Sequence, residues 1–317
     1  MSLFQRVLRF LSLLAGLAAG AAVAIAALIT KRLITPPRQP LWATPGDLGL
    51  KFENVQFPAQ DGVRLSGWFV PAADGRRKGA TLVLVHGWTW NRLGDAADDA
   101  LSNLSGATPV DLLRLAFSLQ QDGFHVFMFD LRNHGESAAL PPFTFGQLEA
   151  HDLLGALDYL ANRAEVAADR IGVVAFSAGA NALLYALPQT SLVQAGVAVQ
   201  PTTPAIFSRR YATYLFGPAG GAMAGLVDAM YQRAGGVKMS AFQPSFAAAG
   251  IHDAPVLFVQ GKGDDWGSME DVVRIAAATP EPQGPLFVDS THRYGGYQYV
   301  VDNPKILTAF FTEHLPE

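Results

Sequence analysis

The chain has 317 residues, half of them hydrophobic, which is enough to bury one large core in one or two domains. A net charge of −4 without a long basic run argues against a nucleic-acid-binding surface. Because cysteine is absent, disulfides, thiolate catalysis and cysteine metal sites are excluded, while no redox compartment is selected.

A membrane-spanning helix is predicted at the N-terminus. The run from Phe10 to Thr30 carries no charge, follows two arginines, precedes Lys31 and Arg32, and is long enough to cross a bilayer. Its Ala-rich part lies inside the run, which favours an uncleaved anchor over a cleaved signal peptide or a buried soluble helix. We therefore expect residues 1–34 to be a single-pass anchor. The flanking charges leave its orientation open, and we expect the domain on the extracytoplasmic side.

Small residues line one face of this anchor. Ser12, Gly16, Gly20 and Ala24 recur every four residues, a spacing that lets two membrane helices pack closely. The pattern predicts a weak homodimer through the anchor, although a segment rich in small residues also produces it by chance. The proline-rich residues 35–46 that follow are expected to form an extended tether to the domain.

The first half of the domain, residues 47–317, alternates strands and helices. Strands are predicted at 49–57, 63–70, 80–85 and 125–129, and helices at 110–121 and 145–164. Asp61 belongs to the Asp-Gly turn between the first two strands, so its expected role is structural. Strand 80–85 ends in His86-Gly87-Trp88-Thr89-Trp90-Asn91, and strand 125–129 ends in Asp130-Leu131-Arg132-Asn133-His134-Gly135-Glu136-Ser137. The acidic cluster of Asp95, Asp98 and Asp99 is interpreted as a solvated insertion rather than a cation site.

The segment from Arg170 to Leu187 organises the rest of the chain. An apolar, β-branched strand stops at Ser177, and an Ala/Leu-rich helix begins at once. A serine at such a corner stands clear of the backbone, with the positive end of the helix behind it. Ala175 and Gly179 are small, as the close approach of strand and helix requires. This pattern predicts a nucleophile elbow.

The second half of the domain interrupts the alternation once. A strand at 192–199 precedes residues 200–252, where one helix is predicted at 223–233, and then a strand at 254–260, a helix at 269–278, a strand at 285–288 and a closing helix at 300–314. Gly261-Lys262-Gly263-Asp264-Asp265-Trp266 follows the second of these strands, and Asp289-Ser290-Thr291-His292 follows the third. Aromatic side chains such as Phe207 either line a pocket with Trp88 and Trp266 or belong to the core.

These motifs, in this order, resemble the α/β-hydrolase superfamily over residues 47–317. The resemblance implies a mostly parallel eight-stranded sheet flanked by helices, with a small cap at about 200–252. It implies a triad of Ser177, Asp264 and His292, with Asp265 as the alternative acid, and an oxyanion hole formed by Trp88 and Ala178. His86 and His134 are expected to be structural. Ala175 departs from the usual G-x-S-x-G pattern, which has glycine there.

The reaction implied is hydrolysis of a carboxylic ester or a thioester through a serine acyl-enzyme, with no metal or organic cofactor. The expected partners are a small-molecule ester and, through the N-terminal helix, the membrane, without nucleic acid. A peptidase or amidase of the same fold stays open, and so does a non-catalytic, membrane-tethered binding protein. Deleting residues 1–34 is expected to leave a soluble, active domain.

Overall fold

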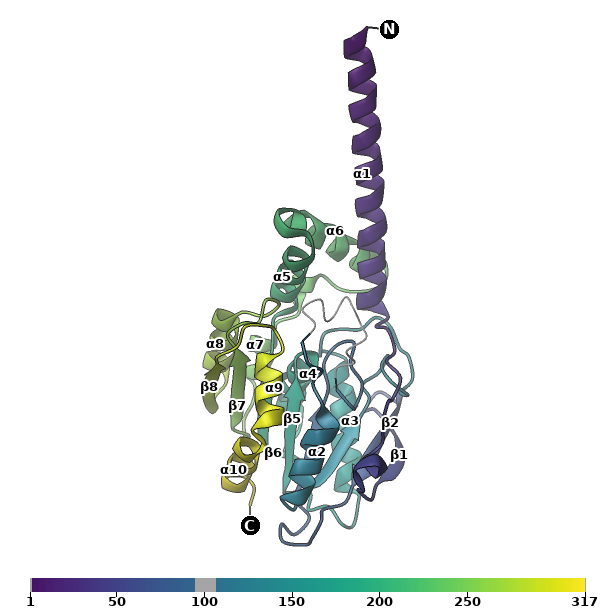
Figure 1. Ribbon diagram of the computed structural model, residues 1–317. Coiled ribbons are helices and arrows are strands. Elements are labelled where there is room, and N and C mark those ends of the chain that lie inside the picture. The colour runs from purple at the N-terminus through teal and green to yellow at the C-terminus, as the bar shows by residue number, and fades with distance from the viewer. Residues whose placement is uncertain (1, 95–106, 317) are drawn as a thin grey trace.

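The computed structural model describes residues 2–94 and 107–316, so the acidic cluster at Asp95, Asp98 and Asp99 lies outside the described residues. Its centre is an eight-stranded sheet in the order β1-β2-β4-β3-β5-β6-β7-β8 (Figure 1). The strands are β1 (Glu53–Pro58), β2 (Arg64–Val70), β3 (Thr81–Val85), β4 (His125–Phe129), β5 (Ile171–Phe176), β6 (Val193–Val199), β7 (Val256–Gly261) and β8 (Pro282–Val288). From β4 to β8 all neighbours are parallel, whereas β1 and β2 are antiparallel additions at one edge.

This sheet confirms the predicted mostly parallel architecture. β3 and β5 are apolar and buried along their whole length, because helices cover both faces of the sheet. The carboxyl ends of parallel strands meet at one edge, so the loops after β3, β5, β7 and β8 come together there. Those loops carry the motifs that the sequence singled out.

Two helical layers enclose the sheet. The core on one face contains side chains of α3 (Glu149–Ala161), α4 (Ala178–Ala186), α7 (Pro244–Ala248) and α8 (Met269–Ala278). The core on the other face contains side chains of α2 (Leu112–Gln121), α9 (Gly295–Asp302) and α10 (Pro304–His314).

Two predicted helix boundaries were wrong, each for a local reason. The closing helix, expected as one element, is interrupted before Pro304, which has no N–H to continue the hydrogen-bond ladder. The helix expected from Phe145 begins at Glu149 because Phe145 and Gly146 have φ of 55° and 111°. The Glu149 carboxylate instead accepts the N–H groups of Thr144 and Gly146, at 3.1 and 2.8 Å.

A cap of two helices covers the carboxyl edge of the sheet. α6 (Gly220–Arg233) includes the helix predicted at 223–233, while α5 (Pro204–Phe216) was not predicted. Pro204 starts α5, a position where the missing N–H costs nothing. In Figure 1 both helices lie above the body of the domain, beside the lower part of the long helix α1.

Helix α1 (Leu3–Ile34) extends away from the domain and yet ends within it (Figure 1). Among the described residues it is the one helix long and apolar enough to cross a membrane, a property that signal sequences share. Its last turns pack on α6, where Ala26, Ile29 and Leu33 are buried in the same apolar cluster as the cap. The Ile34 carbonyl also accepts the Phe143 N–H at 3.0 Å. The end of the predicted anchor is therefore part of the cap core.

Residues 36–44, after α1, form neither helix nor strand and are fastened to the domain. Arg38 donates through Nη1 to the Gly135 carbonyl at 2.7 Å. The Asn91 amide donates to the carbonyls of Gln39 and Pro40 at 3.2 and 3.0 Å. Together with the buried last turns of α1, these contacts place the helix base against the domain.

Candidate active site

Ser177 lies at the corner between β5 and α4 and has the backbone conformation of a sharp turn. Its φ of 53° and ψ of −116° are costly for a residue with a side chain, and such strain is typical of functional sites. The glycine two residues on is required by packing, because a Cβ at Gly179 would lie 2.4 Å from the His86 carbonyl oxygen. Ala175, the departure from the glycine pattern, is fully buried in β5. The strand and helix thus accommodate alanine at that position.

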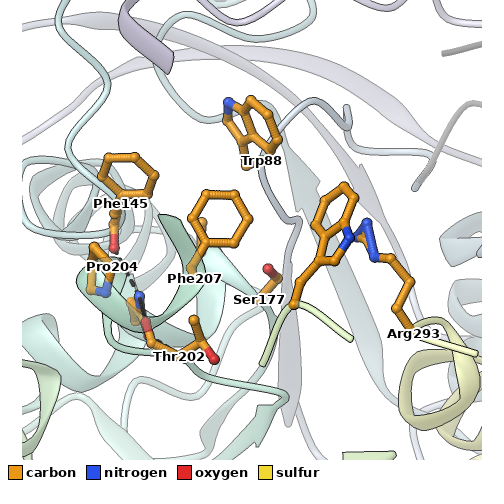
Figure 2. Close-up of a pocket in the computed structure, with 10 residues that line it drawn as sticks. Trp88, Phe145, Ser177, Thr202, Pro204, Phe207 and Arg293 are labelled. Carbon is orange, nitrogen blue, oxygen red and sulfur yellow. Dashed lines mark hydrogen bonds between the residues drawn. The ribbon is translucent and has the colours of Figure 1, made fainter. Parts of the chain in front are cut away.

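A narrow pocket with about 30 Å³ of free volume opens over Ser177. Figure 2 shows the serine hydroxyl among Trp88, Phe207 and Arg293. The walls are mainly aromatic and apolar, with a few polar groups, as in many ligand sites: Trp88, Phe145, Ala178, Asn181, Thr202, Pro204, Phe207, Trp266 and Arg293. Three of the aromatic residues considered from the sequence, Trp88, Phe207 and Trp266, therefore line a pocket.

Trp88 and Ala178 line this pocket, and neither residue donates its backbone N–H to an acceptor in the described part of the chain. Ala178 is the first residue of α4, so its N–H has no partner inside the helix. Trp88 follows the His-Gly pair after β3 and lines the same pocket. Among the hydrogen bonds of the described residues, none uses the N–H of Trp88 or Ala178. A pair of unoccupied donors beside a serine suits an oxyanion hole.

Asp264 is buried at the carboxyl end of β7, whereas Asp265 is exposed. One Asp264 oxygen accepts from Gln200 Nε2 at 2.9 Å and Gln260 Nε2 at 3.2 Å. The other accepts the Trp266 N–H at 3.0 Å. Burial raises the pKa of Asp264, and the positive charge of Arg293 opposes this. Of the two aspartates considered, Asp264 is the one held in the interior.

His292 lies in the loop after β8, beside the Asp264 loop. The two loops are in close contact, because a Cβ added at Gly263 would lie 2.6 Å from the backbone nitrogen of His292. The imidazole Nδ1 accepts the Tyr294 N–H at 3.2 Å. No hydrogen bond among the described residues joins the His292 ring to Ser177 or Asp264. The structure thus brings Ser177, Trp88 and Ala178 together around one pocket, whose lining does not include His292.

A sequence model of the alpha/beta hydrolase family matches residues 82–312. The chain belongs to this family. YfhR of Salmonella typhimurium, an uncharacterized protein, is 28% identical over 242 residues, which cover 76% of this chain and 74% of YfhR. The uncharacterized protein Rv2307c of Mycobacterium tuberculosis is 27% identical over 230 residues, covering 73% of this chain and 68% of Rv2307c.

Solved structures show the same hydrolase fold. The Pyrococcus furiosus esterase Pf2001 superposes with a TM-score of 0.66 at 22% identity, covering 89% of this chain and 100% of the esterase. The Pyrococcus horikoshii acylaminoacyl peptidase superposes with a TM-score of 0.58 at 17% identity, covering 84% of this chain and 42% of the peptidase. The structural neighbours of this hydrolase thus include both an esterase and a peptidase.

Arg293 and Tyr297, which the sequence did not single out, flank the serine of this hydrolase. The Arg293 guanidinium carbon lies 3.6 Å from the centroid of the Trp266 ring, and Arg293 lines the pocket. Burial raises the pKa of Tyr297, and the nearby Ser177 and Gln200 side chains partly oppose this. Arg293 immediately follows His292, so the motif itself pointed to the right loop.

Gln200 holds the loops of the site together and was also missed. Its Nε2 donates to Asp264 and to the Arg293 carbonyl, both at 2.9 Å. Its Oε1 accepts the N–H groups of Gly261 and Gly296, at 3.3 and 3.0 Å. One amide therefore ties the Asp264 loop to the start of α9. The sequence feature that could have identified Gln200 is its position as a polar residue directly after the apolar strand β6.

His86 and His134 serve the scaffold of the hydrolase. His86 is hydrogen-bonded through Nδ1 to the Gly87 carbonyl oxygen at 2.8 Å, and its Nε2 accepts the Leu131 N–H at 3.0 Å. His134 likewise holds the Arg132 carbonyl and accepts the Thr89 N–H. Burial lowers the pKa of both rings, that of His134 to about 3, so both are neutral at pH 7. These contacts fit the structural role expected for both residues.

Asp61 is also structural. It accepts the Arg132 guanidinium in a two-pronged ion pair, with both distances 2.8 Å. Arg132 is fully buried and also pairs with the buried Asp152. The turn after β1 is thereby locked to the loop after β4, as a framework role requires.

Proposed function

We propose that this protein is a serine hydrolase that cleaves carboxylic esters, with Ser177 as nucleophile, His292 as general base and Asp264 as the triad acid. The observation that carries the proposal is Ser177 itself. It is held in a strained turn at the start of a helix, and it faces an aromatic pocket bordered by two unoccupied N–H donors. Thioesters belong to the same reaction class, and a peptidase among the structural neighbours keeps amides as the second substrate class.

The reaction begins when Ser177 Oγ attacks the ester carbonyl carbon and His292 takes the hydroxyl proton. The Trp88 and Ala178 N–H groups receive the oxyanion, and each such donor is worth roughly 10²–10³ in rate. The tetrahedral intermediate collapses to the acyl-enzyme as the imidazolium returns the proton to the departing alkoxide. Water, deprotonated by His292, then attacks the acyl carbon and regenerates the serine.

This mechanism requires the 290–294 loop to move. His292 and Arg293 are neighbours in sequence, and Arg293 lines the pocket while His292 contacts Tyr294. We propose that the imidazole enters the pocket as the guanidinium leaves it. Asp264, already beside Arg293, would then exchange one cationic partner for another. A buried carboxylate is favoured in its charged form by either partner.

Labelling with a fluorophosphonate tests the proposed function. Wild type in detergent micelles should be labelled and should hydrolyse p-nitrophenyl butyrate, whereas Ser177→Ala should do neither. Loss of a triad serine costs on the order of 10⁶ in kcat in a comparable enzyme. Circular dichroism serves as the folding control. A folded wild type that takes up no probe and cleaves no ester would contradict the proposal and favour the non-catalytic binding protein.

The two neighbouring aspartates offer a matched pair. Asp264→Asn should lower kcat for p-nitrophenyl butyrate by about 10⁴-fold, because a neutral amide neither orients nor stabilises the imidazolium. Asp265→Asn changes an exposed side chain and should leave kcat within about twofold of wild type, as surface substitutions usually do. The reverse ranking of the two variants would assign the acid to Asp265.

A further inference from the structure

The uncharged run of α1 continues alongside the cap. It extends from Phe10 to Thr30, between Arg9 and Lys31. At about 1.5 Å per residue, these roughly 21 residues span about 31 Å, which matches the hydrocarbon thickness of a bilayer. Contact with the cap begins at Ala22, which packs on the apolar cluster that α1 shares with α5 and α6. The last part of the uncharged run therefore lies beside the cap and not beyond it.

A bilayer that ended where the cap begins would not fit this run. Residues 10–21 alone span about 18 Å at about 1.5 Å per residue, which is well short of the hydrocarbon layer. To fill the layer, Arg6 and Arg9 would have to enter it, and charged side chains in hydrocarbon are costly. If the layer instead ends at Lys31, both arginines stay among the opposite headgroups. The part of the cap beside residues 22–30 is then at the depth of the lipid.

The cap hairpin, defined as residues 211–227, has a composition that suits this depth. It lies between Arg210 and Asp228 and contains no charged side chain. It comprises the end of α5, a short 3-10 turn at Gly217–Ala219 and most of α6. Helices on a water-facing surface normally carry charged and polar residues on their outer side. Beyond Thr213, the exposed positions of the hairpin are instead all proline, alanine or glycine: Pro218, Ala219, Gly221, Ala222 and Gly225.

The charged residues that bound the cap hairpin are held by backbone groups of the domain and the cap. Arg210 donates through Nε to the Asp265 carbonyl at 3.2 Å, in the loop after β7. Asp228 is half-buried and accepts the Met239 N–H at 2.9 Å. Lys31 is exposed at the end of the uncharged run of α1, where lipid headgroups attract positive charge. An uncharged helical surface edged by such residues is suited to lie in a membrane interface.

We propose that the cap hairpin is a second membrane contact, which lies in the interfacial layer of the same bilayer that α1 crosses. In Figure 1, α5 and α6 lie on the side of the domain from which α1 extends, as this placement requires. The partner of the uncharged surface is then lipid and not another protein. The contact goes beyond the proposed ester hydrolysis and does not depend on it. Because Phe207 of α5 lines the pocket over Ser177, the bilayer borders the helices that cover that pocket.

The absence of cysteine allows depth in the membrane to be measured at single positions of the full chain. Ala222→Cys and Ala309→Cys are a matched pair, because both alanines are exposed on helices. Ala222 belongs to the cap hairpin, whereas Ala309 belongs to α10, at the end of the domain opposite α1 (Figure 1). Leu14→Cys, in the free part of α1, reports whether that helix is in lipid. Each variant carries the fluorophore NBD on its cysteine.

In phosphatidylcholine vesicles, the label at position 222 should emit at shorter wavelength than the label at position 309. Doxyl-labelled lipid should quench it at least about twofold more strongly, since an interfacial helix lies at the boundary of headgroups and acyl chains. Equal, water-like signals at 222 and 309, with a lipid signal at 14, would overturn the hairpin contact and leave α1 as the anchor. Water-like signals at all three positions would overturn both.

A second test needs no variant and decides the question if a labelled chain fails to fold. Phosphatidylcholine with a diazirine on its acyl chain, irradiated in vesicles that contain the wild-type chain, should crosslink to residues 211–227 as well as to α1. Residues 304–314 of α10 should stay unmodified and serve as the internal control. Crosslinks confined to α1 would overturn the proposal. Both tests are independent of turnover, so a chain that cleaves no ester could still confirm the membrane contact.

Discussion

His292→Ala should lower kcat for p-nitrophenyl butyrate by roughly 10⁴–10⁶-fold, whereas Tyr297→Phe should lower it by less than about tenfold. Both side chains are candidates for the proton of Ser177, and the Tyr297 hydroxyl is near enough for Ser177 to influence its pKa. Burial raises the pKa of Tyr297, however, so its hydroxyl stays protonated at pH 7 and accepts no proton from serine. An imidazole has a lone pair that can take the serine proton and is the better base.

Steady-state kinetics and fluorophosphonate labelling of both variants would decide between these two bases. Loss of the Tyr297 hydroxyl removes about one neutral hydrogen bond, which corresponds to the small effect expected. Tyr297→Phe keeps the ring that packs edge-on against Trp90 at 5.2 Å, so the fold should be unchanged. A severe loss in Tyr297→Phe with full activity in His292→Ala would make the loop movement of His292 unnecessary and would assign a different base.

Deleting residues 2–34 should disorder the cap, whereas deleting residues 2–24 should leave a folded domain with a reactive Ser177. This expectation replaces the simpler one from the sequence, in which the whole anchor was separable. Ile29 and Leu33 are buried against the cap, and burial of each side chain adds about 1.5–3 kcal/mol to the free energy of unfolding. Their loss exposes the apolar side of α6, including Val227, and removes a large part of a typical stability of about 5–15 kcal/mol.

Limited proteolysis and thermal unfolding measure this difference between the truncations. The longer deletion should be cleaved within residues 204–233 and should unfold at a lower temperature. Leu33→Ala and Leu28→Ala give a matched pair in the full chain, because Leu33 is 1% exposed and Leu28 is 54% exposed. Leu33→Ala should lower the free energy of unfolding by about 2–5 kcal/mol, whereas Leu28→Ala should change it little. Equal protease resistance of both truncations would show that α1 contributes nothing to the cap.

Local sequence patterns predicted most of the scaffold. The strands of the parallel sheet other than β8 are mainly apolar runs bounded by glycine or polar residues, and such runs are confined to the interior wherever helices cover both faces. The turn at Ser177 could also be predicted from the sequence. A serine between a strand and a helix needs small residues on both sides, because strand and helix approach each other closely there. Asp264 could be placed after its strand, and burial then distinguished it from Asp265.

The contacts around the serine depended on loops whose conformations no periodicity describes. The sequence alone could place His292 in the loop after β8, but the Tyr294 N–H and the packing of Arg293 on Trp266 determine where its ring points. Gln200 joins segments that are 61 and 96 residues away along the chain, so only the assembled fold reveals its role.

The N-terminal helix shows the same division between sequence and tertiary structure. Its hydropathy alone determined that it is long and apolar enough to span a bilayer, because that property depends on consecutive residues. That its last turns line the cap was decided by tertiary packing, because burial of Ile29 and Leu33 requires α6, about 200 residues later in the chain, to lie against them.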